Sequence, residues 1–246
     1  MSQKTKIEWT ESTWNPISGC TKISRGCDNC YAEKMAFRLQ AMGTKGYENA
    51  FEVTLHPEAL TKPLKLKKPQ MIFVNSMSDI FHDKVPDEFI FEIFEIMNKA
   101  HWHTFQVLTK RPKRLEALND KLKWADNIWM GVSIESNDYI KRADYLRGCD
   151  AKTKFLSIEP LIGSVDKLDY TGLNWVIVGG ESGFGAREMK KEWVVDVQEK
   201  CTHLHIPFFF KQWGGVNKKA AGRQLDGKIY DELPKIHENN LFKNVS

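Results

Sequence analysis

Residues 127–135 read NIWMGVSIE, an almost unbroken apolar run that ends in a carboxylate. Such a run is typical of a parallel strand covered on both faces, because a strand with one wet face alternates apolar and polar residues. The following segment, SNDYIKRADYLRGC at 136–149, has the pattern of an amphipathic helix. A strand followed by a helix is the repeating unit of an α/β fold with right-handed crossovers.

The same unit recurs along the chain on both sides of this segment. Four further helices are predicted at 28–42, 85–100, 111–118 and 190–204. The other predicted strands are TWNPISG (13–19), FEVTLH (51–56), MIFVNS (71–76), TFQVLTK (104–110), KFLSIEP (154–160), NWVIVGG (174–180) and IPFFFKQW (206–213). With up to eight strands, we expect a complete or partial (β/α) barrel in preference to a doubly wound sheet. The barrel would span residues 1–213, and residues 214–246 would form a C-terminal extension or lid that contains a hairpin at 222–233.

Composition narrows the class of protein. The chain has 246 residues, with 36 basic and 32 acidic side chains and a formal net charge of +4, a mild bias that suits an anionic partner. The polar start MSQKTKIEWTES is unlike a signal peptide, and nothing approaches the roughly 20 apolar residues of a membrane helix. We therefore expect a soluble cytoplasmic protein without a membrane partner. The basic run LTKPLKLKKPQ (60–70) is either a solvated connector or a contact for nucleic-acid phosphates.

Polar side chains concentrate where the predicted strands end. In a β/α barrel the chemistry takes place at the carboxyl ends of the strands, so these residues are predicted to meet at one rim. The candidates at this rim are Ser78, Asp79, Lys110, Ser133, Glu135, Glu159, Glu181, Lys211 and Gln212.

The segment GCTKISRGCDNCYA (19–32) holds three of the five cysteines, namely Cys20, Cys27 and Cys30. An odd number of cysteines without an export signal favours thiol or metal chemistry over a disulfide framework. Three interpretations remain open: a zinc site completed from elsewhere in the chain, a C-x-x-C redox pair, or three ligands of a [4Fe–4S] cluster whose fourth iron is open. Cys149 and Cys201 lie on apolar helix faces and are predicted to be core residues.

Eight motifs carry a resemblance that covers nearly the whole chain: WNPISGC, GCDNCYAE, SMSDIFH, LTKRP, GVSIES, LSIEPL, GGESG and FFFKQWG. With them the chain resembles the phage-associated three-cysteine-motif family, predicted to be radical S-adenosylmethionine-like proteins. It is more distantly similar to the spore photoproduct lyase group, in which a CxxCY segment opens a β/α barrel. Ser-Asp, Thr-Lys and Val-Ser-Ile end three of the strands of that barrel.

The resemblance implies a radical S-adenosylmethionine enzyme on a partial β/α barrel. A [4Fe–4S] cluster on Cys20, Cys27 and Cys30 would cleave S-adenosylmethionine to a 5′-deoxyadenosyl radical. By the same similarity, Tyr31, Ser78, Lys110 and Ser133 would contact S-adenosylmethionine. The other rim residues would then line the substrate side, namely Asp79, Glu135, Glu159, Glu181, Lys211 and Gln212.

The implied substrate is a nucleic acid or nucleotide, and an external electron donor and a partner protein would assist. The alternative is a non-catalytic nucleic-acid-binding protein stabilised by zinc or a cluster, with aromatic side chains for base stacking.

Overall fold

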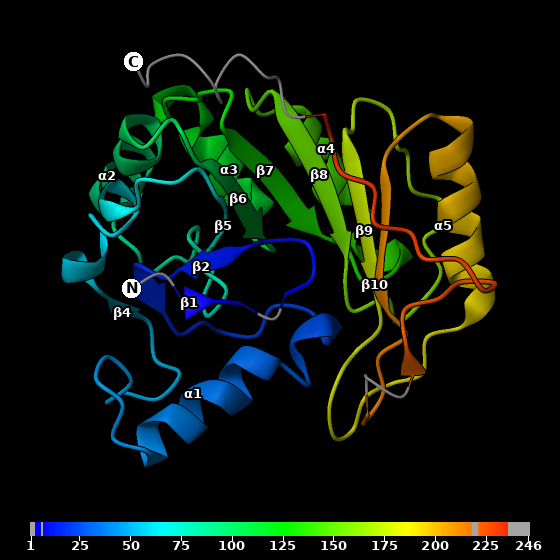
Figure 1. Ribbon diagram of the computed structural model, residues 1–246, viewed down its shortest axis with the longest axis horizontal. Helices are drawn as coiled ribbons and strands as arrows, with labels where there is room; N and C mark the ends of the chain where they lie inside the picture. Colours follow the sequence, from blue (N-terminus) through cyan, green and yellow to red (C-terminus); the bar gives the residue numbers. More distant parts are fainter. Residues whose placement is uncertain (1–2, 6, 218–220, 236–246) are drawn as a thin grey trace.

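The computed structural model describes residues 3–5, 7–217 and 221–235. Its main sheet has eight strands in the order β1-β2-β5-β6-β7-β8-β9-β10, and all but β1 run parallel to their neighbours. The seven parallel strands form a curled half-barrel (Figure 1). The strands are β1 Gln3–Lys4, β2 Ser12–Trp14, β5 Met71–Val74, β6 Thr104–Thr109, β7 Ile128–Ser133, β8 Thr153–Ile158, β9 Trp175–Gly179 and β10 Phe208–Gln212.

Two predicted strands differ from expectation. The segment 13–19 divides into β2 and a second short strand, β3 Ile17–Ser18. The segment 51–56 contributes only β4 Thr54–Leu55, which pairs antiparallel with β3 in a separate two-stranded sheet. The prediction of a barrel strand at 51–56 is therefore wrong: its alternating polar residues suit a surface ribbon, not a strand covered on both faces. Among the described strands, β1 and β10 are edges and do not pair, so the barrel is partial.

The helices follow the strands in the predicted order. They are α1 Tyr31–Ala41, α2 Asp87–Lys99, α3 Pro112–Leu118, α4 Lys141–Arg147 and α5 Lys191–His203. Single 3-10 turns lie at η1 Arg25–Cys27, η2 Pro57–Ala59, η3 Pro63–Lys65, η4 Asn119–Lys121 and η5 Asn137–Tyr139. Pro86 precedes α2 as its N-cap. No described helix combines the length and the apolar character needed to cross a membrane.

The two faces of the sheet have different cores. The outer face packs a larger cluster of aliphatic and aromatic residues against α2 to α5, with Cys149 and Cys201 in the same cluster. The inner face carries a separate aromatic cluster of Trp9, Phe73, Trp129, Phe155, Trp175, Ile177 and Phe209. The ring of Trp175 lies 5.6 to 6.2 Å from the rings of four of these residues. This cluster fills the inner face of the half-barrel away from the carboxyl ends of its strands. Polar side chains that could contact a ligand are therefore found at the carboxyl ends.

Gly131 makes this inner packing possible. A Cβ atom at residue 131 would lie 2.5 Å from the ring of Phe155, its neighbour on β8. One rung closer to the carboxyl ends, Ser133 pairs with Ser157. On β7 and β8 the inner face therefore changes within two residues from the close contact of Gly131 with the Phe155 ring to a pair of serines.

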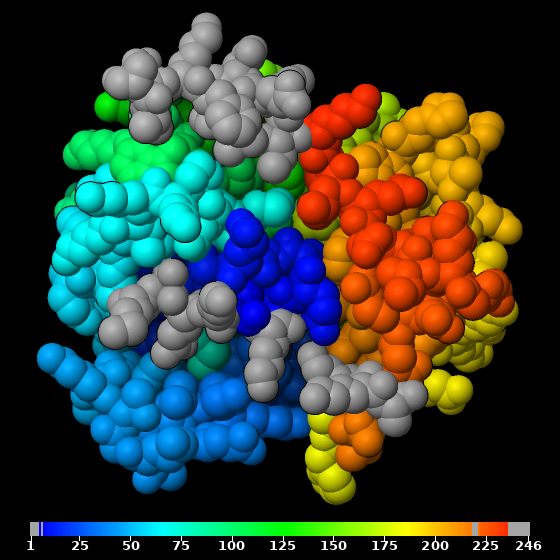
Figure 2. All heavy atoms as spheres, viewed as in Figure 1, coloured from blue at the N-terminus to red at the C-terminus, as the bar shows by residue number. Residues whose placement is uncertain are grey.

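The described part of the C-terminal extension wraps the edge of β10. A tight turn with left-handed Asp226 and Gly227 joins Leu225 and Lys228, as the predicted hairpin requires. The chain then returns along β10, where Phe210 N–H donates to Tyr230 O at 2.8 Å. Figure 2 shows this segment, in orange and red, beside the N-terminal residues in dark blue. The exposed edge of the sheet is thus covered by the chain's own backbone.

A buried histidine makes stability depend on pH. His103 Nδ1 accepts from Gln70 N–H at 3.1 Å, so Nε2 carries the hydrogen and faces Pro63 O at 3.1 Å. Burial lowers the pKa of His103, and it also lowers the pKa values of His56 and His82. Because the unfolded chain then binds more protons than the folded one, stability is complete above about pH 6.5 and is lost as the pH falls below it.

We expect the free energy of unfolding to fall by at most about 1.4 kcal/mol per pH unit for each such histidine. Urea unfolding at several pH values between 7 and 5 measures this slope. His103→Asn should flatten it, whereas the same change at the exposed His205 should leave it unaltered. An identical slope in the His103 variant would contradict the assignment.

Candidate functional site

The cysteine loop, residues 19–30, lies between β3 and α1 at the carboxyl end of the half-barrel. The loop begins directly after β3 at Gly19, whose φ angle is +82°. The Gly19 backbone lies so close to the backbone of Phe51 and Glu52 that a Cβ atom at residue 19 would be 2.1 Å from Glu52 O. Gly19 also bridges to Ser78, whose hydroxyl donates to Ile17 O at 2.9 Å. The end of β5 therefore fixes the start of the loop, and the Ser78 hydroxyl is part of this attachment.

The three cysteines of the loop are free thiols and are half-buried. Cys149 and Cys201 are also free but are buried in the helix-side core, which confirms their prediction as core residues. Among the described residues, no three His, Cys, Asp or Glu side chains converge on one metal-ion position. A [4Fe–4S] cluster does not need such convergence, because each thiolate binds a different iron atom.

Cys20 lies beside a cation that the sequence interpretation did not include. Arg111 Nη2 is 3.9 Å from the Cys20 sulfur and donates to the Thr21 hydroxyl at 2.7 Å, and that hydroxyl also meets His82 Nε2 at 2.9 Å. Burial and the nearby Asp79 raise the pKa of Cys20 to about 12. The thiol therefore holds its proton at neutral pH, and a metal that binds it must release that proton.

Asp79 joins the ends of β5 and β6. One carboxylate oxygen accepts from the Thr109 hydroxyl at 2.7 Å, and the other accepts from Lys110 N–H at 3.0 Å. The side chain is buried, and both of its oxygens are engaged within the protein. These bonds set the position at which the Lys110 side chain leaves the sheet.

Glu135 is fully buried between two cations and the cysteine loop. Its Oε2 accepts from Arg142 at 2.8 Å, and its Oε1 lies 3.6 Å from Lys110 Nζ. The same Oε1 accepts from the hydroxyl of Ser24 at 2.8 Å. Two positive charges therefore face one negative charge here, which leaves this part of the site with an excess of positive charge.

Tyr31, the first residue of α1, points its hydroxyl into the site. The hydroxyl donates to Ser76 O at the end of β5, although much of the ring is exposed. Desolvation of the phenol oxygen beside the Ser76 backbone raises the pKa of Tyr31, and interaction with Cys30 and Glu159 adds to the effect. Glu159 pairs with Lys211 across the rim at 2.6 Å.

Glu181 contacts the cysteine loop at Asn29, further along the loop than the Ser24 contact of Glu135. It accepts from Asn29 at 2.9 Å and from the guanidinium of Arg187. Arg187 in turn donates to Arg25 O at 2.8 Å and to Asp28 at 3.1 Å. Although burial alone would raise the pKa of Glu181, these hydrogen bonds lower it below the usual value. The carboxylate thus remains charged at neutral pH.

Gln212 ends the rim at β10. Its amide nitrogen donates to the Ser182 hydroxyl, while its amide oxygen is buried without a hydrogen-bond partner. The structure therefore places all the sequence-predicted site residues on the cysteine loop, on the first turn of α1 or at the carboxyl ends of the strands. The partners that sequence reasoning missed are Ser24, Asn29, Arg111, Tyr139, Arg142 and Arg187.

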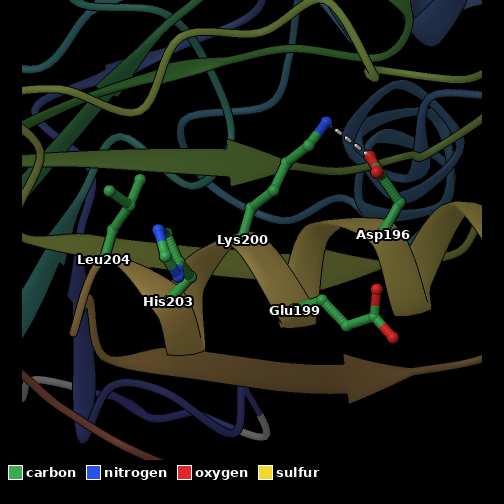
Figure 3. A pocket seen from close by; sticks show the side chains of 5 residues that line it. All are labelled: Asp196, Glu199, Lys200, His203 and Leu204. Atoms are coloured by element: carbon green, nitrogen blue, oxygen red, sulfur yellow. Dashed lines mark hydrogen bonds and ion pairs between the residues drawn. The ribbon is translucent and has the colours of Figure 1, made fainter.

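A shallow hollow on the outer face of α5 is separate from this site (Figure 3). It is lined by Asp196, Glu199, Lys200, His203 and Leu204. Lys200 pairs with Asp196 at 2.9 Å and also donates to Asp166 O. These are ordinary contacts along a surface helix, so they supply control positions for experiments rather than a second candidate site.

Solved structures of spore photoproduct lyase share this fold. One is complexed with dinucleoside spore photoproduct, and another is a variant with bound S-adenosylmethionine (AdoMet) and the same dinucleoside. Each is 11% identical to the chain with a TM-score of 0.50, and the match covers 81% of this chain. It spans 63% of the length of the lyase, and at this identity the similarity is one of fold.

No curated protein matches the chain. A model of the DUF5131 family, described as proteins of unknown function, matches residues 4–234. The matched segment includes the whole sheet from β2 to β10, the cysteine loop and every site residue described above. The chain therefore belongs to the DUF5131 family.

Proposed function

We propose that the protein is a radical S-adenosylmethionine enzyme in which Cys20, Cys27 and Cys30 hold a [4Fe–4S] cluster. The observation that carries this proposal is the position of the cysteine loop beside Lys110, at the polar end of a half-barrel whose other end is filled by aromatic rings. Three free thiols and a cation within one rim suit a cluster with one open iron, together with a carboxylate-bearing cofactor.

The residues present fit such a group. Arg111 Nε is buried without a hydrogen-bond partner, although the other end of the guanidinium lies 3.9 Å from the Cys20 sulfur. A buried N–H of a charged group is costly when it is unpaired, so an anionic group beside Cys20 would satisfy it. Thiolate-bound clusters are anionic, and the donor set of three cysteines is the one that such clusters use.

Within this proposal each residue has a physical task. Cys20, Cys27 and Cys30 would hold the cluster, which when bound would supply the one electron needed to cleave S-adenosylmethionine into methionine and a 5′-deoxyadenosyl radical. Lys110 binds the carboxylate of the cofactor, and Ser133 offers a hydroxyl from the inner face of β7. Ser78 and Tyr31 hold the cysteine loop and α1 against the end of β5, and their hydroxyl oxygens remain able to accept from the cofactor.

The substrate side of the rim is assigned to the pair of Glu159 and Lys211 and to Gln212. Three further carboxylates were predicted on this side, namely Asp79, Glu135 and Glu181. Their oxygens already form hydrogen bonds or ion pairs with other residues of the chain. We propose a nucleic acid or a nucleotide as the substrate class, which the bound dinucleoside of the structurally similar lyase supports. The exposed ring of Phe184, whose carbonyl is held by Lys34 beside the cysteine loop, is available for base stacking.

An electron donor from outside the chain is part of this proposal, because the described residues include no second redox centre. A partner protein, the phage association and the cytoplasmic location remain predictions. The basic run at 60–70 contains the turn η3; Leu64 and Leu66 pack on the core, and the lysines of the run lie at the surface. This packing favours the connector interpretation of the run.

Reconstitution with iron and sulfide under anaerobic conditions tests the proposal. We expect a brown protein whose reduced cluster gives an electron-spin resonance spectrum that changes when AdoMet is added. Formation of 5′-deoxyadenosine with dithionite should follow. A colourless protein that holds stoichiometric zinc and takes up no cluster would overturn the proposal and favour the non-catalytic nucleic-acid-binding alternative.

A further inference from the structure

Three consecutive residues of the cysteine loop contact one segment, residues 133–142, which follows β7 and leads into α4. We call this the cradle segment. The Ser24 hydroxyl donates to Glu135, and the backbone N–H of Arg25 donates to the Tyr139 hydroxyl at 3.1 Å. The third residue, Gly26, packs directly on the side chain of Glu135. These contacts immediately precede Cys27.

We infer that the cradle segment positions Cys27 and that Glu135 is its central positioning residue. The functional meaning of the inference, though not its geometry, rests on the proposed function of the loop. Sequence reasoning assigned Glu135 to the substrate. Because the carboxylate is fully buried and has protein partners on both oxygens, it acts through the loop instead.

The packing at Gly26 is as specific as the hydrogen bond at Ser24. A Cβ atom at residue 26 would lie 2.4 Å from Cγ of Glu135 and 2.6 Å from its Oε1. The φ angle of Gly26 is not in the left-handed region, so contact with Glu135, rather than backbone conformation, is what excludes a side chain here. The loop backbone therefore rests directly on the buried carboxylate.

Arg142 ties the two contact points of the cradle segment together. Its guanidinium donates to Glu135 Oε2 and to Ser133 O, each at 2.8 Å. It also lies over the ring of Tyr139, with 4.5 Å between the guanidinium carbon and the ring centroid. A salt bridge and a cation–π contact on one side chain fix Glu135 and Tyr139 relative to each other. Their two bonds to the loop consequently act as one support.

Glu135 also connects the loop to the cofactor side of the site. The oxygen that accepts from Ser24 is the one that lies 3.6 Å from Lys110 Nζ. A single carboxylate oxygen thereby sets the distance between the cysteine loop and the lysine proposed to bind the carboxylate of AdoMet. Loss of the charge would release both groups, since removing one member of a buried ion pair leaves its partners uncompensated.

Hydrogen–deuterium exchange on the protein without iron or AdoMet tests the inference independently of the proposed function. The amides of Arg25, Cys27 and Asp28 are hydrogen-bonded to Tyr139, Ser24 and Arg25 respectively. We expect Glu135→Gln to speed exchange at residues 24–28 about tenfold. Tyr139→Phe, which keeps the aromatic ring, should do the same at Arg25.

Glu159→Gln is the matched control, because Glu159 is another rim carboxylate paired with a lysine and makes no hydrogen bond to the loop. It should leave exchange at residues 24–28 unchanged. If Glu135→Gln loosens the whole sheet, Tyr139→Phe decides the question, since it leaves the ion pairs intact. Wild-type exchange at residues 24–28 in both the Glu135 and the Tyr139 variant would overturn the inference.

A second readout uses the reconstituted protein. Tyr139→Phe should lose iron to a ferrous chelator about tenfold faster than wild type, at an unchanged midpoint of thermal unfolding. A general structural role would shift the unfolding midpoint instead. The two proposals can fail separately. If the Glu135 and Tyr139 variants exchange faster than wild type at residues 24–28 but the protein takes up no iron, the role of the cradle segment is supported and the proposed function is refuted.

Discussion

Replacing Cys27 by alanine is expected to abolish cluster binding after anaerobic reconstitution. Cys27 is half-buried in the turn η1 and lies between the supports provided by Glu135 and Glu181, so no other cysteine can replace it. Two remaining thiolates would leave two irons without a protein ligand, and cubane clusters of this kind depend on cysteine thiolates. We expect iron to fall from about four atoms per chain to a small fraction of one. Iron and sulfide assays, together with the visible absorption of the cluster, measure this.

Cys201→Ala is the matched control, because Cys201 is a free cysteine buried in α5 on the helix side of the sheet. It should reduce stability modestly and leave iron content at the wild-type value. Full iron content in the Cys27 variant, or loss of iron in the Cys201 variant, would contradict the assignment of the ligands.

The sheet was predictable because its strands are covered on both faces. Continuous apolar runs such as 127–135 identify strands of this kind, and each of the seven parallel strands overlaps a predicted one, although β2 and β8 begin one residue before the predicted start. The segment 51–56 was predicted wrongly because Val53 and Leu55 alternate with polar residues, a pattern that does not say which sheet a strand joins. The curl of the sheet depends on pairing between distant residues, which local patterns do not encode.

For the candidate site, the sequence indicated where the polar residues lie but not which residues they contact. Polar residues after strands indicated one rim, and the structure has that rim. Sequence alone could not show that Glu135 and Glu181 face the cysteine loop, because their partners lie 111 and 152 residues away from them along the chain. The missed arginines offered weak signals: Arg111 directly follows Lys110 in the motif LTKRP, and Arg187 follows the glycine-rich GGESG. An arginine is often a surface residue, so neither position is informative without its contacts.

The largest predicted effect on cofactor binding concerns Lys110. Lys110→Met removes the charge but keeps most of the aliphatic stem, and Arg142 remains to compensate Glu135. A hydrogen bond between charged groups contributes about 1.5–3 kcal/mol. We therefore expect the Kd of the reconstituted protein for AdoMet to rise about 10- to 100-fold, as measured by titration of the electron-spin resonance change.

Lys200→Met controls for the loss of a lysine, because Lys200 is paired with Asp196 on α5 (Figure 3) and lies outside the half-barrel. It should leave AdoMet binding unchanged. Higher salt should weaken binding to wild type more than to the Lys110 variant, since only the former has the ionic contact. An unchanged Kd in Lys110→Met would show that the excess positive charge beside Glu135 serves the loop alone. The carboxylate of the cofactor would then have to bind elsewhere on the rim, with Lys211 as the remaining lysine among the predicted site residues.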